Sequence, residues 1–369
     1  MIPVNEPIFI GREKYYLQQC IDTGWISSEG PFVKKFEVAF SKSVGCNYGI
    51  AVSNGSAAIE VALAALNVGP GDEVIIPSFT IISCVLAVIR LGAKPVLVDC
   101  DPLTWNMDVN QVSDKLTEKT KVIMAVHIYG LPVDIDPLLL LAEEKGIYVI
   151  EDSAEAHGLH YKGRACGSMG VIGTFSFYAN KLITTGEGGM VVTNDAELAE
   201  RCRSLRNLCF RKDRRFVHDE MGWNYRLTNL QAAIGLAQME HIDEFIAIKR
   251  RNGSLYTKLL SNVESLQLPL DRTQHSENIY WVYGVVIRDD VPLDAKIVMD
   301  RLAASGIGTR PFFWPMHEQP VFKKMGLFNN QAFPVAEKIA RRGFYLPSGL
   351  ALTSQQSETV VSALEEAIK

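Results

Sequence analysis

Residues 173–193 read GTFSFYANKLITTGEGGMVVT, and this stretch holds the pattern that decides the fold. Two short apolar runs, Gly173–Phe177 and Met190–Val192, lie on either side of a polar segment rich in glycine. Apolar runs of this length, bounded by turn residues, are typical of buried strands. The stretch therefore predicts two strands, with Lys181 between the first strand and a glycine-rich turn.

The same kind of apolar run recurs along the preceding part of the chain. The further runs are Gly49–Val52, Val74–Ile76, Pro95–Val98, Val122–Val126 and Tyr148–Ile150. Amphipathic segments separate them, and in one of these Ile59, Leu63 and Leu66 share a helical face. Strands that alternate with helices predict an α/β fold, with a doubly wound and mainly parallel sheet between helices.

The C-terminal part of the chain predicts a second, smaller α/β domain. Thr228–Gln231 matches a helix capping box, and the helical pattern that it opens continues to about Leu260. A strand, a helix, an extended stretch and a last helix are expected at residues 280–287, 293–304, 308–313 and 354–368. We therefore expect a large domain at residues 1–245 and a small one at residues 246–369, with the N-terminal segment 1–25 packed on the small domain.

Composition and charge exclude several classes of function. The 369 residues include 37 Lys and Arg against 42 Asp and Glu, and the net charge of −5 argues against a general nucleic-acid binder. The 7 cysteines are odd in number and lack C-x-x-C spacing, so we expect neither a disulfide framework nor a metal site. Neither a signal peptide nor an apolar stretch of membrane-spanning length is visible, so we expect a soluble, cytoplasmic protein without membrane contact.

Polar residues follow two of the predicted strands directly, where ligands bind in open α/β sheets. Residues 53–56 (SNGS) follow the first strand and precede a helix, a combination that favours phosphate. The alternative is that Ser56 is only a helix N-cap. Asp152, Glu155 and His157 follow a later strand, and a helix cap is again the simpler interpretation of Asp152.

Lys181 is the third candidate, because it is the only lysine between Lys162 and Lys212. An exposed lysine would be unremarkable, whereas a desolvated one has a lowered pKa and becomes a nucleophilic amine. Pyridoxal 5′-phosphate requires a phosphate cradle, a carboxylate for its pyridinium proton and a lysine for a Schiff base. The three sites together meet these requirements, so we predict this cofactor.

Segments across nearly the whole chain resemble the DegT/DnrJ/EryC1/StrS nucleotide-sugar aminotransferases, which are fold-type I pyridoxal-phosphate enzymes. The segments are GWISSEGPFVKKFE (24–37), VSNGSAAIEVAL (52–63), GDEVIIPSFT (71–80), VHIYG (126–130), IEDSAEAHG (150–158), TFSFYANKLITTGEGGMVVTND (174–195), GWNYRLTNLQAAIGLAQ (222–238) and RPFFWPMH (310–317). The resemblance implies a homodimer with shared active sites. It also implies transfer of an amino group from L-glutamate to C4 of a nucleotide-linked 4-keto-6-deoxy sugar.

Details such as IPVNEP near the N-terminus, EDSAEA and RPFFWPMH imply GDP-4-keto-6-deoxy-D-mannose as the sugar substrate. Three departures from the family pattern leave a UDP- or dTDP-linked sugar open. Ile81 replaces an aromatic residue, Leu208 and Cys209 replace a pair that ends in glycine, and Trp314 replaces a tyrosine.

The resemblance also assigns roles to single residues. Lys181 resembles the Schiff-base lysine, which moves a proton between C4′ of the cofactor and C4 of the sugar. Asp152 resembles the partner of the pyridinium nitrogen, and Glu155 lies where the family has Gln or Glu near the 3-hydroxyl. The other implied cofactor contacts are Gly55, Ser56, Ile81, Ser176 and, from the second subunit, Asn224. The implied substrate contacts are Trp25, Arg310 and His317.

Two other functions remain as alternatives. Related sugar 3-dehydratases have His in place of the Schiff-base lysine, so Lys181 argues against that reaction. A binding protein or regulator without catalysis is disfavoured because Lys181, Asp152 and the phosphate cradle are all present.

Overall fold

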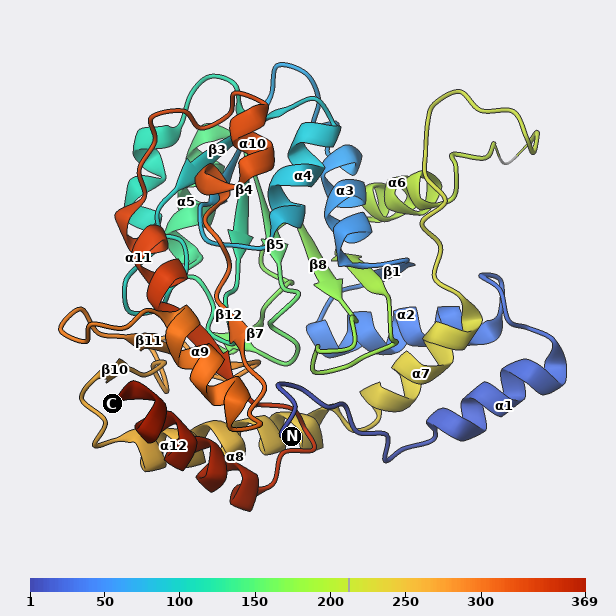
Figure 1. Ribbon diagram of the computed structural model, residues 1–369. Coiled ribbons are helices and arrows are strands. Elements are labelled where there is room, and N and C mark those ends of the chain that lie inside the picture. The colour runs from blue at the N-terminus through green and yellow to red at the C-terminus, as the bar shows by residue number, and fades with distance from the viewer. Residues whose placement is uncertain (212) are drawn as a thin grey trace.

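The structure is a computed structural model that describes residues 1–211 and 213–369. It contains a seven-stranded sheet in the order β1-β9-β8-β5-β4-β2-β3 and a four-stranded sheet in the order β10-β11-β13-β12 (Figure 1). The strands of the large sheet are β1 (Tyr48–Val52), β2 (Glu73–Pro77), β3 (Lys94–Val98), β4 (Thr120–Val126), β5 (Tyr148–Asp152), β8 (Ile172–Ser176) and β9 (Gly189–Thr193). A two-stranded ribbon, β6 (His160–Tyr161) with β7 (Arg164–Ala165), follows β5.

Each apolar run that we predicted as a strand of this sheet falls in one of its strands, except that Phe177 lies just beyond the end of β8. Strand β9 is antiparallel to its neighbours β1 and β8, and the other adjacent pairs are parallel. The predicted α/β fold with a mainly parallel sheet is therefore confirmed. The two strands expected around Lys181 are β8 and β9, and all their residues are buried.

Helices cover both faces of the large sheet because its strands are apolar on both sides. Within β2, Val74 and Ile76 pack into one core and Ile75 packs into another. One face carries α3 (Gly55–Ala65), α4 (Ile82–Arg90) and α6 (Ala196–Arg206). The other face carries α2 (Pro31–Val44), α5 (Asp136–Lys145) and α7 (Asn229–Met239). Helix α1 (Glu13–Thr23) packs on α7 at the edge of the molecule (Figure 1).

The C-terminal part has a core of its own around the small sheet. The strands are β10 (Leu266–Gln267), β11 (Tyr283–Ile287), β12 (Arg310–Pro311) and β13 (Gly343–Leu346). The helices are α8 (Ile242–Leu260), α9 (Ala295–Ala304), α10 (Pro320–Lys324), α11 (Pro334–Arg342) and α12 (Ser354–Ile368). Short 3-10 turns occur at η1 (Val109–Gln111), η2 (Ser113–Lys115) and η3 (Met316–Glu318).

The N-terminal segment lies against this C-terminal part (Figure 1). Ile2 forms a parallel bridge with Ile307, and the N–H of Ser348 donates to the carbonyl of Val4 at 3.1 Å. The first residues thus contact loops of the C-terminal part, whereas α1 packs on α7 beside the large sheet.

The predicted long helix after the capping box is two helices. The box itself is present at Thr228, whose side chain accepts from the N–H of Gln231. The chain then leaves the helix after Met239, where Arg12 pairs with Glu240 at 2.6 Å. A new helix, α8, starts at Ile242, and the expected boundary between residues 245 and 246 falls in its first turns.

Two further expectations concern cysteines and membranes. All 7 cysteines are buried and free in the structure. Among the described residues, no helix has both the length and the apolar character needed to cross a bilayer.

Candidate active site

A cavity of 630 Å³ lies at the C-terminal ends of β1, β5 and β8. Parallel strands end at the same edge of a sheet, which is where ligands bind in this kind of fold. The cavity lining includes the predicted residues Gly55, Ser56, Ile81, Asp152, Glu155, Ser176 and Lys181. The structure therefore brings together the three sites that we inferred separately from the sequence.

The N-terminus of α3 forms one end of this cavity. Its N-cap is Asn54, whose side chain accepts from the N–H of Ala57 at 2.8 Å, so the alternative interpretation of Ser56 as the N-cap is wrong. The hydroxyl of Ser56 instead lies 2.7 Å from that of Ser83. Free N–H groups and the helix dipole make such a terminus suitable for an anion.

Gly55 lets this helix terminus approach the end of β8 closely. A Cβ atom at Gly55 would lie 2.7 Å from Cβ of Ser176, closer than side chains pack. The glycine therefore keeps the backbone N–H groups beside Ser176 accessible to a ligand. This close approach fits the phosphate end of pyridoxal 5′-phosphate, since a bulkier residue would fill the cradle.

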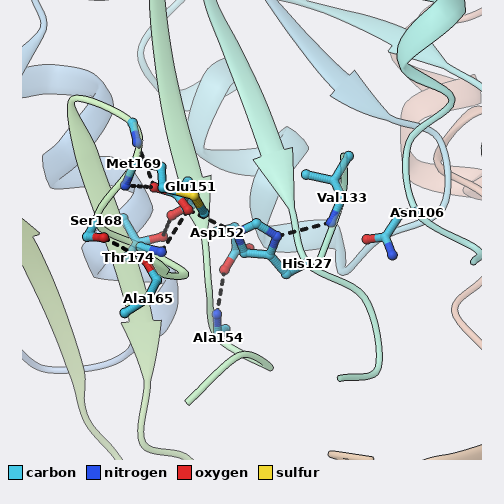
Figure 2. A network of polar contacts seen from close by, with 12 residues as sticks. Asn106, His127, Val133, Glu151, Asp152, Ala154, Ala165, Ser168, Met169 and Thr174 are labelled. Atoms are coloured by element: carbon cyan, nitrogen blue, oxygen red, sulfur yellow. Dashed lines mark hydrogen bonds and ion pairs between the residues drawn. The ribbon is translucent and has the colours of Figure 1, made fainter. Parts of the chain in front are cut away.

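Asp152 is the carboxylate at the end of β5 that faces the cavity. Its Oδ1 accepts from the N–H of Ala154 at 3.1 Å (Figure 2), and burial raises the pKa of its carboxyl group. The preceding Glu151 accepts instead from the N–H groups of Gly167 at 2.7 Å and Met169 at 2.6 Å. Glu151 therefore holds a loop in place, and Asp152 is available to a ligand.

Lys181 lies in the segment between β8 and β9. Its Nζ is 3.7 Å from Oε1 of Glu155 and 3.8 Å from the centre of the Trp281 ring. Burial lowers the pKa of the Lys181 amine and raises the pKa of Glu155 to about 7. The other oxygen of Glu155 accepts from the N–H of Tyr129 at 2.9 Å, which fixes the carboxyl group beside the amine.

Several residues of the cavity were missed by sequence reasoning. Trp281, Phe313 and Tyr345 come from the C-terminal part and form an aromatic wall opposite the large sheet. Arg90 also lines the cavity, where it lies 3.6 Å from the buried Glu60. Phe313 belonged to the segment RPFFWPMH and Trp281 to the strand expected at residues 280–287, but no local pattern marked either of them, or Arg90 and Tyr345, as a cavity residue.

Ile81 lines the cavity directly before α4 and remains 41% exposed. Its side chain offers a ligand an aliphatic surface in place of a stacked ring. His157, which we had noted beside the two carboxylates, is buried away from the cavity against Phe40, Phe175 and Phe177. Burial lowers the pKa of His157 to about 3.

Two of the predicted substrate contacts do not line this cavity. Arg310 is exposed on β12, where it pairs in register with Tyr345 of the cavity wall. His317 is buried, and its Nε2 lies 2.9 Å from Oε1 of Glu337. Glu318 lies in the same cluster but is paired with Arg341 at 2.6 Å, so we assign no metal ion to these side chains.

Trp25 and Asn224 also lie outside the cavity, and both side chains are exposed. Trp25, 51% exposed, lines a second cavity of 850 Å³. Arginines dominate the lining of that cavity: Arg203, Arg206, Arg211, Arg215 and Arg226. Leu208 and Cys209 lie near it and have φ angles of 60° and 50°, a region that favours glycine.

Trp314, the third departure from the family pattern, is 44% exposed. The guanidinium of Arg341 lies 5.2 Å from its ring centre. This contact is on the outside of the C-terminal part, away from the lining of the main cavity.

The sequence matches the DegT/DnrJ/EryC1/StrS aminotransferase family over residues 8–365, and the chain belongs to this family. The GDP-perosamine synthase of Escherichia coli O157:H7 is 42% identical over 365 residues, which cover 99% of this chain and 98% of that protein. The GDP-perosamine synthase of Caulobacter vibrioides is 41% identical over 367 residues, covering 100% and 98%. Among solved structures, S. venezuelae DesV has a TM-score of 0.90 at 32% identity and covers 97% of this chain and 94% of that one.

Family membership confirms three predictions made from the sequence. The chain has the predicted α/β fold, it is an aminotransferase, and its cofactor is pyridoxal 5′-phosphate, as in the rest of the family.

Proposed function

We propose that this enzyme transfers an amino group from L-glutamate to C4 of GDP-4-keto-6-deoxy-D-mannose and thereby forms GDP-perosamine. The observation that carries the reaction type is one cavity that gathers Lys181, Asp152 and the N-terminus of α3. The full-length similarity to two GDP-perosamine synthases supports the choice of sugar and nucleotide.

The residues of the cavity fit the cofactor at each of its polar positions. The N–H groups around Gly55 and Ser56, with the hydroxyl of Ser176, would hold the phosphate. Asp152 would hold a proton at the ring nitrogen, and Glu155 would contact the 3-hydroxyl group. Bound in this way, pyridoxal phosphate supplies an electron sink for the carbon that carries the transferred nitrogen.

Lys181 is the proposed Schiff-base lysine and proton carrier. Because burial lowers the pKa of its amine, the neutral form is more available at neutral pH than for an exposed lysine. Its Nζ can then take the proton from the α-carbon of L-glutamate and later deliver a proton to C4 of the sugar. Glu155, at 3.7 Å, and the face of Trp281 orient the amine for both transfers.

The aromatic wall of Trp281, Phe313 and Tyr345 would exclude water from the reacting atoms. Exclusion of water strengthens the electrostatic contacts inside a site and prevents loss of reactive species. These residues belong to the C-terminal part, so we propose that residues 246–369 act as a small domain that covers the cofactor bound to residues 1–245.

We further propose a homodimer in which Trp25 and Asn224 reach the active site of the second subunit. Both side chains are exposed in the single chain and lie outside its own cavity. Large apolar side chains are exposed in the same two segments, with Ile26 beside Trp25 and Met221 close before Asn224. Arg310 and His317 remain proposed substrate contacts. The buried, unpaired cysteines support a cytoplasmic location.

The assignment of the substrate is tested with a panel of GDP-, UDP- and dTDP-linked 4-keto-6-deoxy sugars. The purified protein is incubated with each sugar and L-glutamate, and the products are identified by mass spectrometry. We expect an amino sugar from the GDP-linked substrate and none from a Lys181→Ala control. Turnover of a UDP or dTDP sugar, without turnover of the GDP sugar, would contradict the assignment.

A further inference from the structure

Cys84 lies directly behind the cavity, in the first turn of α4. It is fully buried, and its Sγ donates to Oδ2 of Asp152 at 3.3 Å. The same sulfur lies 3.3 Å from Oγ1 of Thr80. The one thiol proton is directed to Asp152, so the hydroxyl of Thr80 donates to the sulfur. The three side chains form a buried chain of hydrogen bonds that ends on the carboxylate.

Both oxygens of the Asp152 carboxylate are therefore held by donors of this chain. Oδ1 accepts from the N–H of Ala154 at 3.1 Å, and Oδ2 accepts from Cys84. Asp152 is only 3% exposed. Burial destabilises the charge of its carboxylate, and hydrogen bonds to the carboxylate favour the ionised form. The two donors, one in the turn after β5 and the other in α4, also restrict rotation of the carboxylate plane.

The thiol remains a donor at all ordinary pH values. Burial and the nearby Asp152 raise the pKa of the Cys84 thiol well above its usual value, so it keeps its proton. Cys84 is therefore not a reactive thiolate. Its polar role is the hydrogen bond that it donates to Asp152.

We propose that Cys84 is a positioning residue, whose thiol keeps the Asp152 carboxylate ionised and fixed in the orientation in which it lines the cavity. This inference rests on the proposed function, because it takes Asp152 as the partner of the cofactor's ring nitrogen. Cys84 itself touches neither substrate nor cofactor in this assignment and acts through Asp152.

The test measures the affinity of the apo enzyme for pyridoxal phosphate, by titration of the visible absorbance of the bound cofactor. Cys84→Ala removes the donor, and Cys84→Ser keeps one. Cys202→Ala is the matched control, because Cys202 is also fully buried but lies in α6, outside the cavity. A hydrogen bond to a charged group, here from a weak donor, predicts a dissociation constant about tenfold higher in Cys84→Ala. We expect Cys84→Ser and Cys202→Ala to stay within about twofold to threefold of the wild type.

A double-mutant cycle with Asp152→Asn separates positioning from simple packing. If Cys84 acts through the carboxylate, Cys84→Ala changes the dissociation constant less than about twofold when Asp152 is already Asn. An equal effect in both backgrounds, or no effect of Cys84→Ala on its own, would overturn the inference. Should Cys84→Ala fail to fold, Cys84→Val supplies a variant of similar volume without a donor.

Failure of this inference is distinguishable from failure of the proposed function. A wild-type protein that shows no visible band with pyridoxal phosphate would refute the function, whatever Cys84 does. If the wild type binds the cofactor but the effects of Cys84→Ala and Asp152→Asn on the dissociation constant are additive, only the role of Cys84 is refuted.

Discussion

The raised pKa of Glu155 predicts how the stability of the cofactor-free enzyme depends on pH. Replacement of Glu155 by Gln keeps the size of the side chain and removes its titration. The Gln side chain imitates the protonated carboxyl group of Glu155, which is the form that burial favours. The variant should therefore match the wild type at low pH and differ from it at high pH.

The size and sign of the effect follow from the two pKa values. Burial raises the pKa of Glu155 from 4.5 to about 7, so the folded chain holds this proton over a range where the unfolded chain has released it. The stability that this proton contributes is fully present below pH 4.5 and is lost as the pH rises through 7. At 1.36 kcal/mol for each unit of pKa, the difference between 4.5 and about 7 corresponds to about 3 kcal/mol in the free energy of unfolding.

The measurement is urea unfolding of the cofactor-free protein at pH 5 and pH 8, at one fixed protein concentration. We expect Glu155→Gln to be about 1 kcal/mol more stable than the wild type at pH 5 and about 3 kcal/mol more stable at pH 8. Glu118→Gln, at an exposed glutamate, is the control and should follow the wild type at both values.

The reasoning would be refuted if Glu155→Gln and the wild type changed in parallel between the two pH values. That result would mean that Glu155 titrates in the folded protein as it does in the unfolded chain. The buried pair with Lys181 would then have to be described differently.

Three further variants test other parts of the site. His157→Leu should make the folded protein more stable at acidic pH, because burial lowers the pKa of His157 to about 3 and the folded state accommodates only its neutral form. At pH 5 the free energy of unfolding, measured with urea, should rise by about 2 kcal/mol, and a lower free energy in the variant would contradict this. Gly55→Ala should weaken cofactor binding more than about tenfold, since the new Cβ meets Ser176 at 2.7 Å, whereas Gly69→Ala, with its nearest atom at 3.9 Å, should not. Asp152→Asn should still bind some cofactor yet lose most turnover, and near-normal kcat would show that another carboxylate holds the ring nitrogen.

The large sheet could be predicted from the sequence because its strands are buried on both faces. Runs such as Val74–Ile76 and Met190–Val192 are apolar without alternation, and turn residues bound each of them. The boundaries of the strands were accordingly close to those of the structure. The same reasoning gave the N-terminus of α7, because a capping box is a local signal.

The break between α7 and α8 could not be predicted in this way. The residues around Glu240 and His241 are compatible with a continuous helix. At the break, contacts distant in sequence are present, since Arg12 and Tyr16 of the N-terminal segment both bind Glu240. No local pattern contains that information.

In the candidate site, too, some features follow from local sequence and others only from long-range packing. Lys181, Asp152 and Gly55 lie at or just after the ends of mutually parallel strands of the large sheet, so their convergence follows from the topology. Trp281, Tyr345 and Cys84 reach the site through the packing of other elements, and the sequence around each resembles an ordinary buried segment. The sequence therefore indicated the polar groups of the site and left the surfaces that shape it unpredicted.

The central claim is that Lys181 carries the cofactor. It is tested most directly by reduction of the purified, cofactor-loaded enzyme with borohydride, followed by proteolysis and mass spectrometry of the peptides. The account predicts a pyridoxyl phosphate adduct on the peptide that contains Lys181, at the Lys181 side chain. An adduct on another lysine, such as the buried Lys249, or no adduct in a protein that shows the visible band, would contradict it.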